Sequence, residues 1–124
     1  MMENSSEDAL LLSDFLAGKP EHTLVLFHHL VNEFSKAGAV SLHPTKTMIG
    51  IANEHKRIAW VTALGKNFIH VVFPFKHPYN DNLCFQKIAQ VPGQDQFNHH
   101  FRMQQIEDVN EEVMGFMKLA YNDE

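Results

Sequence analysis

The apolar residues of this chain change their spacing twice, and this constrains the fold more than any other feature. Over residues 20–36 they recur every three or four positions, at Leu24, Phe27, Val31 and Phe34. That spacing is typical of an amphipathic helix. From about residue 40 the period becomes two, which is typical of strands, and after Asp108 the helical spacing returns. The sequence therefore predicts strands flanked by helices, an α+β domain.

Turn-forming residues divide the middle of the chain into strands. We expect five of them, over residues 46–52, 58–61, 68–73, 83–91 and 97–103. Parallel strands need long crossovers and these connections are short, so we expect an antiparallel meander. Two N-terminal helices and one C-terminal helix are the elements available to cover one of its faces. Residues 1–124 suit a single domain with one core.

Charge is unevenly distributed along a chain of formal net charge −5. Residues 15–106 hold nine basic and five acidic residues, together with all nine histidines, whereas both ends are acidic. Acidic helix faces at the two ends would account for the pattern. An anion-binding surface formed by the middle segment would account for it as well.

The compartment is suggested by what the sequence lacks. Cys84 is the only cysteine, so no disulfide can form within the chain, which favours a reducing environment. No stretch approaches the roughly 20 apolar residues of a membrane span. The acidic N-terminus does not resemble a signal peptide. We therefore expect a cytoplasmic protein with no membrane partner.

Several short motifs stand in the expected strands and in the last helix: Thr45-Lys46-x-Met48-Ile49, Ile58-Ala59-Trp60, Phe97-x-His99-His100-Phe101 and Asp108-Val109-x-Glu111-Glu112-Val113. In this order they resemble a family of small bacterial domains catalogued as domain of unknown function 5655. The resemblance covers about residues 15–121. It implies an α+β fold and brings no assigned activity. Some relatives are attached to nuclease-like domains, which by analogy points towards nucleic acid.

The expected strand at residues 97–103 carries the clearest candidate residues. Alternate side chains of a strand face opposite sides. One face carries Phe97, His99, Phe101 and Met103, and the other carries Asn98, His100 and Arg102. His99 is thus expected to be buried. It is either a structural histidine with a hydrogen-bond partner or a pocket histidine near Trp60 or His70.

The other candidates suit the binding of an anion. His100 and Arg102 share a strand face, and they either form a solvated surface or bind a carboxylate or phosphate. Lys46, expected to open a strand, either lies along the end of the sheet or anchors an anion. Trp60 is either a core residue or a stacking platform. His70 shares a strand face with apolar residues and has the same two interpretations as His99.

Motifs for metals, nucleotides and covalent catalysis are missing from the sequence. There is no His-Glu-x-x-His, Cys-x-x-Cys, Gly-x-Gly-x-x-Gly or Gly-x-Ser-x-Gly, so we expect no metal and no cofactor. The residues favour a non-enzymatic binding module for an anionic ligand, either a small molecule or nucleic acid. One alternative is a protein-interaction domain that forms a homodimer through its sheet or through an edge strand. The other is an enzyme with histidine acid–base chemistry.

Overall fold

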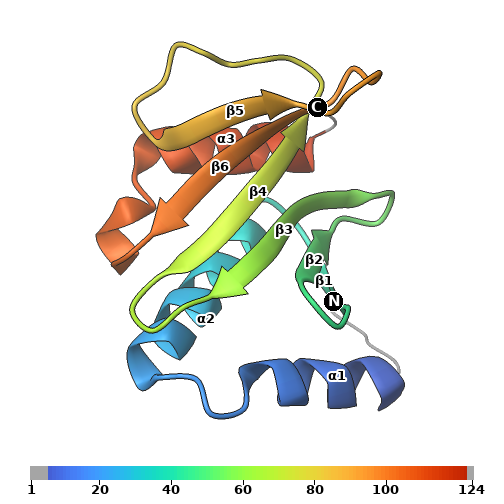
Figure 1. Ribbon diagram of the computed structural model, residues 1–124, viewed down its shortest axis with the longest axis vertical. Coiled ribbons are helices and arrows are strands. Elements are labelled where there is room, and N and C mark those ends of the chain that lie inside the picture. Colours follow the sequence, from blue (N-terminus) through green and yellow to red (C-terminus); the bar gives the residue numbers. More distant parts are fainter. Residues whose placement is uncertain (1–5, 123–124) are drawn as a thin grey trace.

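The computed structural model describes residues 6–122, which form three α-helices and one six-stranded antiparallel sheet (Figure 1). The helices are α1 (Ser6–Leu16), α2 (Glu21–Ser35) and α3 (Glu111–Tyr121). The strands are β1 (Ser41–Pro44), β2 (Ile49–Ala52), β3 (Arg57–Leu64), β4 (Ile69–Phe75), β5 (Phe85–Gln90) and β6 (Phe97–Met103). The predicted α+β class, with two helices before the strands and one after them, is confirmed. No helix of the described part is long and apolar enough to cross a membrane.

The first predicted strand is replaced by a hairpin of two short strands, β1 and β2. Thr45 makes the turn between them: its hydroxyl accepts hydrogen bonds from the amides of Thr47 and Met48, at 3.3 and 3.1 Å. Its own amide donates to the Met48 carbonyl at 2.8 Å. A strand beginning at Lys46 was therefore a wrong prediction, because the side chain of Thr45 stabilises a turn there.

The sheet is a meander only over its first four strands. Its order is β1-β2-β3-β4-β6-β5, so β6 lies between β4 and β5. Because β6 is antiparallel to both neighbours, β4 and β5 run parallel. The connection over residues 76–84 brings the chain back to the start of β5 in Figure 1. Nine residues, when fully extended, span about 30 Å, which is enough to return along a strand of this length. The connection can therefore place β5 parallel to β4 with β6 between them. The prediction that β4 and β5 are neighbours in a meander was wrong.

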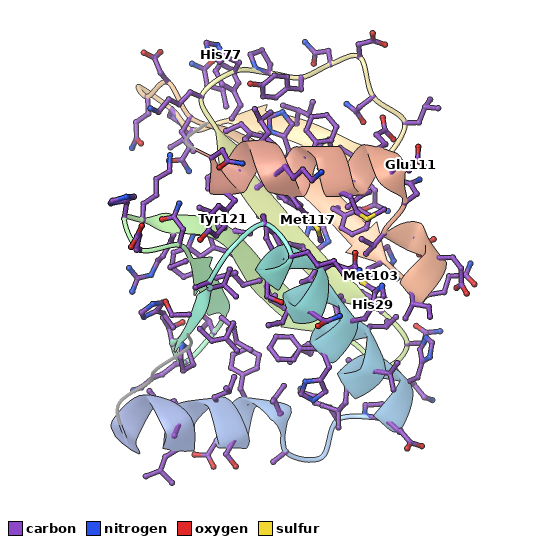
Figure 2. The ribbon with its side chains drawn as sticks, turned by 180° about the vertical axis from the view of Figure 1, so that it is seen from behind. His29, His77, Met103, Glu111, Met117 and Tyr121 are labelled. Atoms are coloured by element: carbon purple, nitrogen blue, oxygen red, sulfur yellow. The ribbon has the colours of Figure 1, made fainter. Side chains whose placement is uncertain are left out.

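Of the described elements, α2 and α3 lie on one side of the sheet and none covers the other side, whereas α1 lies beyond the sheet, next to β1. Figure 1 is seen from the uncovered side, and Figure 2 shows α2 and α3 lying across the opposite face. Between these helices and the sheet lie buried apolar side chains, among them Leu30, Phe34, Phe73, Met103 and Met117. Phe34 of α2 stacks on Phe73 of β4 with ring centroids 5.8 Å apart. The core is thus a single layer between helices and sheet.

The last helix begins two residues later than its sequence suggests. Asn110 caps α3, since its side-chain oxygen accepts a hydrogen bond from the amide of Val113 at 3.0 Å. Asp108 instead accepts hydrogen bonds from the amides of Gln104 and Gln105, at 2.8 and 3.1 Å. These bonds belong to a short 3₁₀ turn over Ile106–Asp108, which joins β6 to α3.

Candidate functional site

We call the side of the sheet opposite α2 and α3 the open face. Strand pairing aligns a row of side chains across it, formed by Trp60, Val72, His100 and Lys87. In the next row His70 of β4 lies opposite Arg102 of β6. Four of the six predicted site residues therefore share this face, namely Trp60, His70, His100 and Arg102.

Two histidines form a pair at the centre of the open face. Nε2 of His70 lies 2.9 Å from Nδ1 of His100, so one ring donates a hydrogen bond and the other accepts it. Partial burial is the main reason that the pKa of His70 is lowered, with further contributions from His100 and Arg102. The pKa of His100 is lowered by burial and then by the charge of Lys87. The pair is therefore neutral at neutral pH and offers both polar and aromatic contacts.

Two cation–aromatic pairs flank the histidines. The guanidinium of Arg102 lies over the ring of Phe68, with Cζ 3.8 Å from the ring centroid. Phe68 folds back against Gly65 at the β3–β4 turn, where any larger residue would overlap its ring. On β3, the guanidinium carbon of Arg57 lies 5.6 Å from the centroid of the Trp60 ring. Each pair presents a planar group next to a positive charge.

Trp60 and Arg57 lie against β2 because Gly50 leaves room for them. A Cβ atom at Gly50 would be only 3.1 Å from Cζ3 of Trp60 and 3.3 Å from Cδ of Arg57. A β-bulge next to Ala52 pairs that residue with Arg57. Regular alternation would point Arg57 and Trp60 to opposite faces, so the irregular pairing explains how both meet at Gly50.

The open face lacks negative charge. The six strands of the described residues contain Arg57, Lys87 and Arg102 and no aspartate or glutamate. Within residues 6–122, none of these three cations has a carboxylate within ion-pair distance. The acidic residues of the described part lie in the helices and connections instead. In a chain of net charge −5, this face is consequently a local region of positive charge.

His99 lies on the other side of the sheet, away from these residues. Its side chain is fully buried, as the alternation over residues 97–103 predicted. Its ring packs edge-on against Phe75, with centroids 4.9 Å apart, and against Phe85, with centroids 5.1 Å apart. A position near Trp60 or His70 was therefore a wrong expectation, because neighbouring residues of a strand face opposite ways and both of those side chains lie on the open face.

Hydrogen bonds to the backbone hold His99 in place. Its Nδ1 donates to the Phe97 carbonyl at 2.7 Å, and its Nε2 accepts from the amide of Tyr79 at 3.0 Å. A protonated ring would turn a second N–H towards that amide, so the neutral Nδ1–H tautomer fits this geometry. His99 thereby fastens the 76–84 connection to β6, which is a structural role.

Lys46 is separate from His100 and Arg102 of the open face. It is exposed in the β1–β2 turn, and β3 and β4 lie between that hairpin and β6. Conversely, the sequence did not single out Arg57, Phe68 or Lys87. Lys87 is found from its pairing with His100, and Arg57 from an irregular strand pair, neither of which can be read from one sequence.

Hollows in the surface lie away from the histidine pair. Five hollows in the surface of the described residues have linings that include none of Trp60, His70, His100 and Arg102. One of about 310 Å³ lies at the end of the sheet, where Arg57, Pro74 and Asp95 line it together with Ala120 of α3. Within the described part of the chain, no three His, Cys, Asp or Glu side chains come together as a metal site would require.

An α+β domain with one uncovered, positively charged sheet face is the class that this architecture defines. The sequence of residues 12–124 matches the family described as "Domain of unknown function (DUF5655)", and the chain belongs to that family. No curated protein and no solved structure matches the chain. The expected family is thereby confirmed, and any function has to be inferred from the site itself.

Proposed function

We propose that this protein is a non-enzymatic module that binds an anionic ligand on its open face. The observation that supports this most strongly is the absence of any acidic residue from the six described strands, together with three cations that lack carboxylate partners. Arg102 supplies a planar set of donors suited to a phosphate or carboxylate. His100 lies beside it on the same strand face and adds a hydrogen-bonding ring.

The geometry gives less support to an enzyme. Acid–base chemistry needs a titrating group within reach of a substrate. His99 has both ring nitrogens bonded to the backbone and is buried, so it offers neither a free base nor access. His70 is accessible, but its Nε2 is engaged with His100. No observation favours a reaction at this pair over simple binding.

A homodimer formed by two open faces is also less well supported. Such a dimer would bring the uncompensated cations of one copy towards those of the other, and like charges facing each other oppose association. A negatively charged ligand would instead neutralise the cations of the open face. We place the proposed binding in the cytoplasm, in keeping with the single cysteine, Cys84.

Binding of inorganic tripolyphosphate, measured by isothermal titration calorimetry at low salt, tests this proposal. We expect Arg102→Gln to weaken binding about tenfold, the loss typical of one charge-assisted hydrogen bond. Lys118→Gln is the matched control, because Lys118 is exposed on α3 at the opposite side of the sheet. Absence of binding to the wild type, or equal weakening by both variants, would refute an anion site on the open face.

A further inference from the structure

We infer that the anion bound by the open face is a single-stranded nucleic acid, which lies across the sheet with bases stacked on its aromatic groups. This inference rests on the proposed function and adds to it the class of ligand. Three features of the open face lead to it: the spread of its cations, its paired planar groups and the position of its central residues outside the hollows of the surface.

The cations are too far apart to share one small anion. Arg57 lies on β3 and Lys87 on β5, with β4 and β6 between them. Three strand spacings separate β3 from β5, which is about 14 Å. A single phosphate at Arg57 therefore cannot reach Lys87. A chain with regularly repeated phosphates can contact Arg57, Arg102 and Lys87 in turn.

The aromatic groups suit planar ligands. Trp60 and Phe68 each lie beside a guanidinium, at 5.6 and 3.8 Å from ring centroid to Cζ. Nucleobases stack on aromatic rings and on guanidinium planes, and each such contact contributes about 1–3 kcal/mol. Polyphosphates and acidic peptides make no comparable use of these planes. The alternation of planar and cationic groups thus fits a ligand that alternates bases and phosphates.

The shape of the face distinguishes a strand of nucleic acid from a small molecule. Small ligands bind in concave sites that enclose most of their surface. Trp60, His70, His100 and Arg102 do not line any of the five hollows described above. An extended strand instead binds along an open sheet, where its unpaired bases reach the aromatic side chains. A duplex keeps its base faces stacked inside and cannot do this.

Trp60 is the only tryptophan of the chain, so its fluorescence reports directly on stacking at the open face. The test titrates the full chain with a single-stranded oligothymidylate of about ten nucleotides, at low salt. We expect saturable quenching of the Trp60 emission. Tripolyphosphate, which has no base, should bind without comparable quenching. A duplex of the same length should bind at least tenfold more weakly than the single strand.

Variants show which group does what. Trp60→Leu should weaken binding of the labelled oligonucleotide at least fivefold, as measured by fluorescence anisotropy, and weaken binding of tripolyphosphate, which has no base to stack, much less. Arg102→Gln should weaken both ligands and reduce the slope of log K against log salt by about 0.7, the value for one phosphate contact with a single strand. Lys118→Gln should change neither ligand. Circular dichroism and thermal unfolding establish that each variant is folded.

The outcomes separate the two proposals. Quenching by the single strand, lost selectively in Trp60→Leu, supports the nucleic-acid inference. Binding of tripolyphosphate without binding of oligonucleotide overturns that inference and leaves the anion site standing. Equal affinity for duplex and single strand, or an oligonucleotide affinity insensitive to Trp60→Leu, also overturns it. Failure to bind either ligand overturns the anion site and the inference together.

Discussion

His70 and His100 are the residues through which the open face responds to pH. Both are neutral at neutral pH, and one hydrogen bond of 2.9 Å joins them. That bond needs one donor and one acceptor, so it exists only while at least one ring is neutral. Because Arg102 and Lys87 already place two positive charges nearby, protonation of the histidines would add a third and a fourth, which is costly. The pair is therefore sensitive to protonation in a way that an exposed histidine is not.

We expect acid to destabilise the protein through this pair. The folded-state pKa of each histidine is lowered, by burial first and by neighbouring charges second. In the unfolded chain both titrate near 6.5, so below about pH 6.5 the unfolded state binds protons that the folded state does not. The free energy of unfolding should therefore fall as the pH is lowered from about 7 towards 5.5. Urea unfolding at several pH values measures it.

The variant His100→Asn should reduce this pH dependence, because it removes one titrating group and its effect on His70. His55→Asn is the control, since His55 is exposed in the β2–β3 connection. A pH profile that is identical in the wild type and His100→Asn would contradict the role of the pair.

His99 should matter for stability. In His99→Leu the amide of Tyr79 loses its acceptor in a partly buried region, and a buried donor left without its acceptor costs about 1–3 kcal/mol. We expect the free energy of unfolding to fall by about 2 kcal/mol, measured by urea denaturation. Proteolysis of the 76–84 connection should become faster as well. A loss below about 0.5 kcal/mol, typical of surface substitutions, would show that the histidine does not hold this connection.

At the scale of the elements, the strand with the most regular alternation was predicted with its correct bounds. β6 spans residues 97–103 as expected, because Phe101 and Met103 alternate with polar residues. β1 was missed because it is only four residues long and precedes a turn set by Thr45. The alternation of side chains along β6 correctly predicted that His100 and Arg102 lie on the same face of the strand. The position of Arg57 could not be predicted in this way, because a β-bulge interrupts the alternation along β3.

The helix α3 contains one residue, Gly115, that disfavours the helical conformation. Gly115 lies inside the helix, and a Cβ atom there would meet nothing within 4 Å. Glycine in a helix interior is about 0.5–1 kcal/mol less favourable than alanine. Gly115→Ala should therefore raise the free energy of unfolding by that amount, measured by urea denaturation.

A matched substitution tests the reasoning. Gly93 also has open space around it, but its φ is +76°, a conformation that residues with a Cβ rarely adopt. Gly93→Ala should therefore destabilise the protein by about 1 kcal/mol. If both variants shift stability in the same direction, backbone conformation is not what distinguishes the two sites.

Over the whole molecule, charge is segregated by layer. The helices carry acidic residues such as Glu21, Glu33, Glu111 and Glu112, whereas the strands carry only basic ones. A polyanion that approaches such a molecule is attracted to one side and repelled from the other, so the field orients it before contact. The net charge alone would have suggested repulsion from any anion.

This segregation predicts that the protein is monomeric without ligand. Two open faces cannot meet without bringing unpaired cations together, an effect that low salt strengthens. Sedimentation equilibrium at low salt should give the mass of one chain, 14.2 kDa. Added single-stranded oligonucleotide of sufficient length should bring two copies onto one strand. A ligand-free dimer that Arg102→Gln does not affect would contradict this picture of the surface.

The insertion of β6 between β4 and β5 has a consequence for the order in which the chain assembles. During synthesis β5 leaves the ribosome before β6, yet β6 is the only strand with which it pairs. β4 already has β3 as a partner, so the first four strands can associate as each one is made. β5 has no strand to pair with until residues 97–103 have been made, after which the two strands form an antiparallel pair that completes the sheet beside β4. The strands that bring Lys87 beside His100 and complete the open face are therefore the last two to find their partners.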